Sequence, residues 1–138
     1  MRAKRMLLII LVSFVSMLCI SGGILMCKGK RINANGALFL EEKEIVDLSE
    51  KAKKGDSEAA LSLGSYYSMI EYDRDRAAEW YKQGADNGNA VCQYNYAFYL
   101  LDISDEKNRD EATTYLLKAA EAGYLPAKKK LESMGISY

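Results

Sequence analysis

An internal repeat constrains the fold of this chain more than any other feature of its sequence. Gly55, Gly88 and Gly123 are 33 and 35 residues apart. The residues before the last two glycines also match, with Ala77 over Ala112 and further small or aromatic pairs between them. A period of this length is typical of helical hairpins that stack into a solenoid, because one hairpin alone cannot bury its apolar face.

The matching columns have the composition of closely packed helices. Small residues let helix backbones approach one another, and aromatic residues fill the space between hairpins. At a constant offset of 33, Ala59, Leu63, Gly64 and Tyr67 lie over Cys92, Tyr96, Ala97 and Leu100. The pattern predicts helices over residues 41–54, 57–70, 75–87, 90–102, 109–122 and 126–134.

Capping residues are found near the expected helix ends. Gly88 and Gly123 follow predicted helices, where a left-handed cap favours glycine. Asp73 and Asn108 each precede the alanine of a second helix by four residues, which is suitable for an N-cap. Pro126, the only proline, falls in the first turn of the last helix, where its missing N–H costs little.

These residues together resemble the Sel-one-like repeat (SLR), a relative of the tetratricopeptide repeat. The motif is carried by Ala59, Leu63, Gly64, Tyr67, Asp73, Ala77, Trp80, Tyr81, Ala85 and Gly88. The resemblance implies an all-α fold, a short right-handed α-solenoid of about two SLR helical hairpins with capping helices. It also implies a non-enzymatic scaffold that binds proteins. The repeats cover about 55–88 and 89–123, and a partial third covers 124–134.

The N-terminal part has a different composition. Residues 1–31 carry six basic and no acidic residues, and Met6–Met26 is a stretch of 21 residues without charge. As a helix this stretch matches the thickness of one hydrocarbon core. We interpret residues 1–27 as an uncleaved membrane anchor, although a cleaved signal sequence and a lipoprotein signal remain alternatives. Residues 28–40 would then be a linker, and 41–138 a solenoid domain outside the cytoplasm (periplasmic in a Gram-negative cell).

Composition excludes several kinds of chemistry. The chain has no histidine, which removes histidine-dependent catalysis and histidine metal sites. Cys92 is the only cysteine beyond residue 27, and its column predicts a buried packing residue. Residues 32–138 hold 13 basic and 19 acidic residues, a net charge of −6 that argues against nucleic acid. We expect no catalytic residue, cofactor, metal or small-molecule substrate.

One helix is apolar on two sides. Besides its core face, residues 90–102 carry Tyr94, Phe98 and Leu101 on the opposite face. The corresponding positions of the preceding hairpin hold smaller residues, which leaves space beside the two rings. This stripe either packs against a neighbouring hairpin or lines a groove for a peptide or helix. The candidate groove residues are Ser62, Ser65, Tyr94, Asn95, Phe98 and Leu101.

Two functions are compatible with these features. The first is a membrane-tethered adaptor that holds a protein partner at the cell envelope. The second is an immunity-type inhibitor that neutralises a secreted toxin, such as a phospholipase effector, because small exported SLR proteins resemble such antitoxins. The last predicted helix carries a basic run, Lys128, Lys129 and Lys130. We interpret this run as the solvated face of the helix, with a basic binding site as the alternative.

Overall fold

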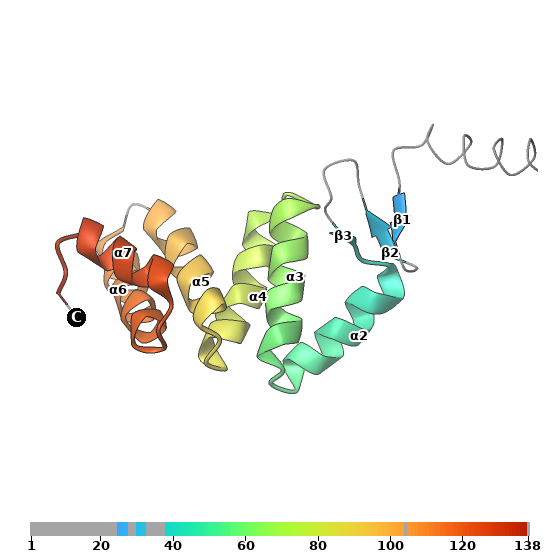
Figure 1. Cartoon of the computed structure of the whole chain (residues 1–138), viewed down its shortest axis with the longest axis horizontal. Coiled ribbons are helices and arrows are strands. Elements are labelled where there is room, and N and C mark those ends of the chain that lie inside the picture. Colours follow the sequence, from blue (N-terminus) through green and yellow to red (C-terminus); the bar gives the residue numbers. More distant parts are fainter. Residues whose placement is uncertain (1–24, 28–29, 33–37, 104, 138) are drawn as a thin grey trace, which may run out of the picture. The chain divides into compact units, whose positions relative to one another are not determined.

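The computed structural model describes residues 25–27, 30–32, 38–103 and 105–137. It divides the chain into two compact units, Met1–Leu40 and Glu41–Tyr138 (Figure 1). The predicted anchor, residues 1–27, lies outside the described residues except at its C-terminal end. Among the residues that are described, no helix has both the length and the hydropathy needed to cross a bilayer.

The first unit contains three short strands that the sequence analysis does not predict. They are β1 (Leu25–Cys27), β2 (Lys30–Ile32) and β3 (Leu38–Phe39), which form an antiparallel sheet in the order β1-β2-β3. In the register of the sheet, Ile32 lies opposite both Leu25 and Leu38. Strands this short give no readable alternation of apolar and polar residues, and the glycines nearby favoured a linker interpretation.

The second unit is all-α and solenoid-like, as predicted (Figure 1). Its helices form successive hairpins, in which each helix packs against the next. The helices are α2 (Glu42–Lys53), α3 (Ser57–Met69), α4 (Arg74–Asp86), α5 (Ala90–Asp102), α6 (Glu106–Glu121) and α7 (Leu125–Ser133).

Side-chain caps fix where the helices begin, and they correct one prediction. The carboxylate of Asp73 accepts the Arg76 amide at the start of α4, as predicted. Asn108 is not a cap, because α6 begins at Glu106 and Asp105 accepts the Lys107 amide at 3.4 Å. Asp105 has the extended backbone conformation of an N-cap, and its carboxylate can accept from the amides that follow it. The helix therefore begins about one turn before the predicted start at residue 109.

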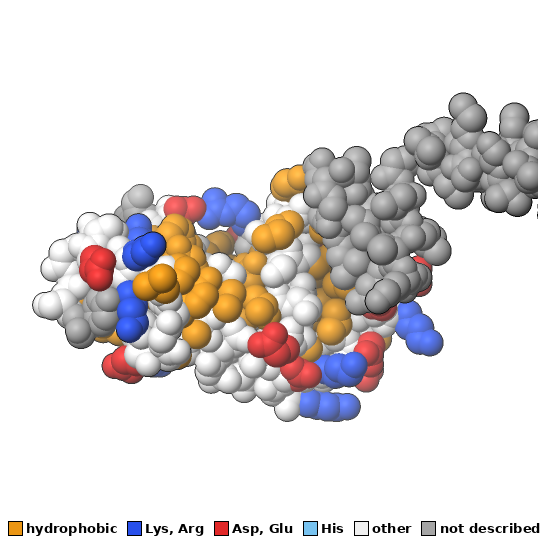
Figure 2. Space-filling model, viewed as in Figure 1, with side chains coloured by type: hydrophobic (Ala, Val, Ile, Leu, Met, Phe, Trp, Pro, Cys, Tyr) orange, Lys and Arg blue, Asp and Glu red, His pale blue; other side chains and the backbone are white. Residues whose placement is uncertain are grey.

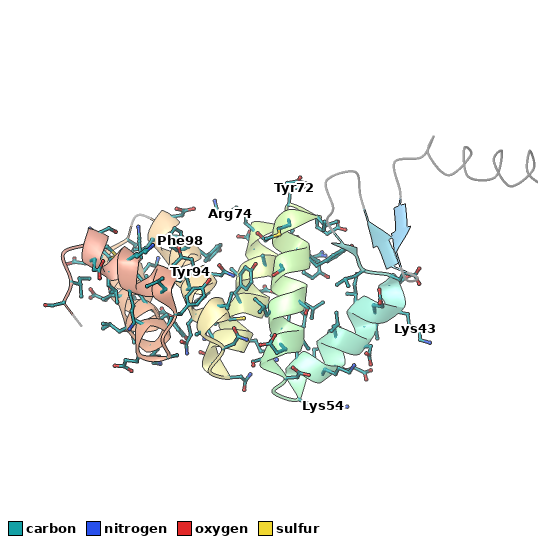
Figure 3. All side chains as sticks on the ribbon, in the orientation of Figure 1. Lys43, Lys54, Tyr72, Arg74, Tyr94 and Phe98 are labelled. Atoms are coloured by element: carbon teal, nitrogen blue, oxygen red, sulfur yellow. The ribbon has the colours of Figure 1, made fainter. Side chains whose placement is uncertain are left out.

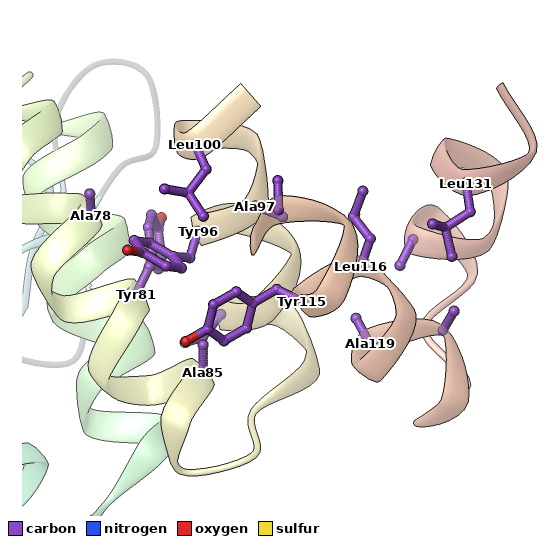
Figure 4. Packing of buried hydrophobic residues seen from close by; sticks show 14 of the residues in the cluster. Ala78, Tyr81, Ala85, Tyr96, Ala97, Leu100, Tyr115, Leu116, Ala119 and Leu131 are labelled. Atoms are coloured by element: carbon purple, nitrogen blue, oxygen red, sulfur yellow. The ribbon is translucent and has the colours of Figure 1, made fainter. Parts of the chain in front are cut away.

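The core consists mainly of alanine, with a few large side chains between the hairpins (Figure 4). The Tyr96 ring meets the Tyr115 ring edge to face at 5.1 Å. The Tyr115 hydroxyl donates to the Asp86 carboxylate at 2.6 Å, so the phenol is satisfied although its ring is buried. Cys92 has no exposed surface, which confirms its prediction as a packing residue.

The loop between α3 and α4 carries backbone strain at Tyr72. Its φ is 55°, in the left-handed region, and its side chain is 80% exposed at the end of the hairpin (Figure 3). This conformation costs a non-glycine residue about 1 kcal/mol.

We expect Tyr72→Gly to raise the free energy of unfolding of residues 41–138 by about 0.5–1 kcal/mol, because strain is relieved and little packing is lost. Chemical denaturation followed by circular dichroism measures this change in stability.

Gly88→Ala is the matched control in the opposite direction. The φ of Gly88 is +85°, and nothing lies within 4 Å of an added Cβ. It should destabilise by a similar amount, through strain alone. A destabilised Tyr72→Gly variant would contradict the strain interpretation.

Candidate protein-binding groove

A groove of about 560 Å³ runs between α3 and α5, with α4 at its base. Its walls combine small polar residues on α3 with aromatic residues on α5, so that the space beside the rings remains open. The lining residues are Leu61, Ser65, Ser68 and Met69 of α3, Arg74, Ala77, Ala78 and Tyr81 of α4, Val91, Tyr94, Asn95, Phe98, Tyr99 and Asp102 of α5, and Tyr124.

The structure brings together four of the six candidate groove residues. Ser65, Tyr94, Asn95 and Phe98 all line the groove. Ser62 does not: it is exposed elsewhere on α3, and its hydroxyl donates to the backbone carbonyl of Glu58 at 2.9 Å. Successive residues of an α-helix are rotated by about 100°, so Ser62 lies about 100° around α3 from Leu61, which does line the groove.

Leu101 is also separated from the groove. It lies in the last turn of α5 and borders a second hollow, on the side of α6 and α7. That hollow is largely polar, since its lining includes Asp105, Glu106 and Arg109. The apolar stripe predicted on α5 is therefore divided between two surfaces.

Tyr94 and Phe98 form the aromatic wall of the groove. Their ring centroids are 4.7 Å apart, and Tyr94 also meets the Tyr124 ring at 5.3 Å. Tyr94 is half-buried, whereas Phe98 is 39% exposed. The stripe thus packs partly on the next hairpin and partly faces solvent, with both rings on one side of α5 (Figure 3). The space-filling view shows hydrophobic side chains gathered on this face of the helical unit (Figure 2).

The polar groups of the groove are suited to hydrogen bonding. Asn95 is half-buried, and its side chain forms no hydrogen bond within the described part of the chain. Burial raises the pKa of the Tyr81 phenol at the base, and the hydroxyls of Ser65 and Ser68 partly offset this effect. Burial likewise raises the pKa of Tyr94. Both phenols therefore remain neutral donors and acceptors near pH 7.

One end of the groove is electrically balanced. The Arg74 guanidinium pairs with the Asp102 carboxylate across the ends of α4 and α5. The Tyr99 hydroxyl donates to Asp75 at 3.0 Å, and the Arg74 guanidinium lies 6.0 Å from the Tyr99 ring centroid. These contacts join α4 to α5, and the charges of Arg74 and Asp102, which line this end of the groove, cancel each other.

The described part of the chain offers little for catalysis. It has no group of three side chains from His, Cys, Asp and Glu placed to hold a metal ion. Burial raises the pKa of the Cys92 thiol to about 12, so it is not a nucleophile at neutral pH. The groove therefore has the properties of a binding surface, with apolar area and a few hydrogen-bonding groups.

Sequence reasoning missed Tyr124 as a groove residue. It occupies the column that holds the helix caps Asp56 and Asn89 in the two preceding units. The sequence shows a tyrosine at a position where the other two units have a capping side chain, and this difference could have marked Tyr124 for a separate role. Because tyrosine does not cap, α7 has no side-chain cap. Met69 was missed because it is exposed at the end of α3, where neither period nor motif marks it.

Comparison with known proteins agrees with this architecture. The family model of the Sel1 repeat matches residues 57–89 and 90–124. None of the curated proteins matches the chain. The chain is similar to the crystal structure of a Sel1 repeat protein from Oxalobacter formigenes, with 22% sequence identity and a TM-score of 0.54 over 68% of this chain and 76% of that chain. This likeness supports the fold alone.

Sel1 repeats generally act as non-catalytic protein-interaction modules, which is consistent with the open groove. The repeat assignment agrees with the structure. The hairpins stack in succession, and Gly88 and Gly123 both have the left-handed conformation at the end of a repeat unit. Residues 57–124 of this chain are two consecutive Sel1 repeats.

Proposed function

We propose that this protein is a membrane-tethered scaffold that binds a segment of a partner protein in the groove between α3 and α5. The observation that carries the proposal is the open aromatic wall, in which Phe98 remains 39% exposed beside a groove of about 560 Å³. Aromatic side chains at the centre of a surface hollow are common binding hot spots. Asn95 supplies an unused amide to orient a backbone.

The membrane part of the proposal rests on sequence. The uncharged stretch Met6–Met26 is flanked by basic residues on both sides, which is typical of a signal-anchor. A short basic N-terminus favours retention in the cytosol, and the helical unit would then be outside the cytoplasm. Fractionation together with protease protection of the helical unit in intact spheroplasts tests both statements.

In-cell photocrosslinking tests the groove. Phe98 is replaced by p-benzoylphenylalanine in the full chain, with Thr114 on the exposed side of α6 as the control position. We expect one protein to be captured from position 98 and not from position 114. Adding Tyr94→Ala should reduce the yield about tenfold or more, because hot-spot truncations cost about 2 kcal/mol.

Folding of each variant is checked by protease resistance of the helical unit. A correctly folded protein that gives no specific crosslink from position 98 would contradict the groove proposal. Tyr94 and Phe98 would then be part of the packing between hairpins.

The captured protein also distinguishes the two candidate functions. A resident envelope protein supports the adaptor. A secreted enzyme supports the immunity-type inhibitor, for which the net charge of −6 over residues 32–138 is a complementary feature toward a basic enzyme surface. In that case, deletion of the gene should reduce viability only when the enzyme is present.

A further inference from the structure

The groove continues into a smaller hollow at its α7 end. This hollow, of about 320 Å³, is lined by Tyr94, Leu125, Pro126, Lys129 and Lys130. Tyr94 borders both spaces, so the aromatic wall leads directly to the hollow. Leu125 is exposed at its edge, and together these residues place apolar surface next to two amines.

The two lysines give this end of the groove a positive charge. Neither Lys129 nor Lys130 forms an ion pair with a carboxylate in the part of the chain that the structure describes. The Lys130 amine lies 5.0 Å from the Phe98 ring centroid, which holds it over the aromatic wall. The opposite end differs, since Arg74 and Asp102 neutralise each other there.

Lys129 is the more informative of the two. Lys130 also borders the second hollow, whose lining includes the carboxylates of Asp105, Glu106 and Asp110. Lys129 borders the hollow beside Tyr94 and lines neither the groove nor the second hollow. Acidic residues outnumber basic ones by 19 to 13 over residues 32–138, yet the Lys129 amine has no carboxylate partner among the described residues. Its charge repels basic partner segments and attracts acidic ones.

We propose that the groove takes a peptide segment in which an apolar or aromatic side chain lies close to an acidic residue. The apolar side chain packs against Tyr94 and Phe98, and the carboxylate lies beside Lys129. The inference rests on the proposed function, because it names the chemistry of the segment that the groove binds. It also changes the interpretation of the basic run 128–130, since part of that run faces the groove.

A peptide library tests the inference on the full chain, held in amphipol. Phage displaying random twelve-residue peptides are panned on the wild type, on Lys129→Glu and on Lys43→Glu. Lys43 is exposed on α2, away from the groove, and gives the matched change of net charge (Figure 3). We expect the wild type and Lys43→Glu to enrich peptides with an apolar residue near Asp or Glu.

With Lys129→Glu, the enrichment of acidic residues should disappear or change to Lys and Arg. The best wild-type peptide should bind Lys129→Glu about tenfold more weakly, and raised salt should reduce this difference. Lys130 is left intact, so that the Phe98 contact is preserved.

Two negative results have different meanings. Apolar enrichment without an acidic residue, or an acidic preference unchanged in Lys129→Glu, overturns the inference and leaves the proposed function standing. No enriched peptide with any variant contradicts the proposed function and the inference together.

Discussion

Gly84→Ala is expected to lower the free energy of unfolding of residues 41–138 by about 2 kcal/mol. A Cβ on Gly84 would overlap the Sγ atom of Cys92 and lie 3.0 Å from the Cys92 Cβ and 3.3 Å from the Ala60 Cβ. Because α3 and α5 both contact α4 at this point, moving away from one worsens the contact with the other. Overpacking of this kind costs up to about 3 kcal/mol, and the better helix propensity of alanine offsets about 1 kcal/mol.

Chemical denaturation of the isolated helical unit measures this effect, since the buried core lies within that unit. The matched control is the double variant Gly84→Ala/Cys92→Ala, in which the added methyl occupies space vacated by the sulfur. A coupling energy of about 1 kcal/mol or more is expected between the two sites. If the effects of the two substitutions simply add, the steric explanation is wrong.

The helices were predictable because the repeat encodes them at several levels at once. The hairpin boundaries are indicated together by the alanine columns, the left-handed glycines and Asp73. Within the described residues, the structure has six helices, one in each of the six predicted ranges. The start of α6 was placed one turn late because Asn108 and Asp105 both have capping side chains. Only the backbone conformation shows that Asp105 is the cap.

The candidate site was predictable only in part, because a groove depends on how hairpins pack. The columns on α3 and α5 gave Ser65, Tyr94 and Phe98, which line one groove. Helix periodicity does not show where a groove ends. It therefore places Leu101 with Tyr94 and Phe98, although in the structure Leu101 borders a different hollow. The contribution of Tyr124 comes from the next hairpin, and a repeat alignment treats that column as a cap.

Alkaline pH is expected to destabilise the helical unit, and Cys92 accounts for the first part of the loss. Burial raises the pKa of its thiol from 9.0 to about 12. The unfolded chain therefore releases this proton near pH 9, whereas the folded chain keeps it until about pH 12. Stability is fully present below pH 9 and falls as the pH rises, by about 3 kcal/mol between pH 8 and pH 11 from this one group.

The tyrosines titrate later, which makes the contribution of Cys92 separable. Burial, together with the hydrogen bond to Asp86, raises the pKa of Tyr115 from 10.0 to about 12, so the loss of its contribution begins about one pH unit above that of Cys92. Between pH 9 and pH 10, Cys92 should contribute about 1 kcal/mol of the loss. Cys92→Ala should reduce the loss between pH 9 and pH 10 by about 1 kcal/mol, whereas Tyr115→Phe should reduce the loss mainly above pH 10.

Denaturation midpoints at closely spaced pH values measure both slopes, and thiol labelling gives an independent control. A buried thiol that reacts only through global unfolding should label at a rate that follows the unfolding free energy as denaturant is added. Labelling that is fast and independent of denaturant would mean that α5 opens locally. The thiol would then titrate without global unfolding, and the Cys92 part of the loss between pH 9 and pH 10 would be absent in the wild type.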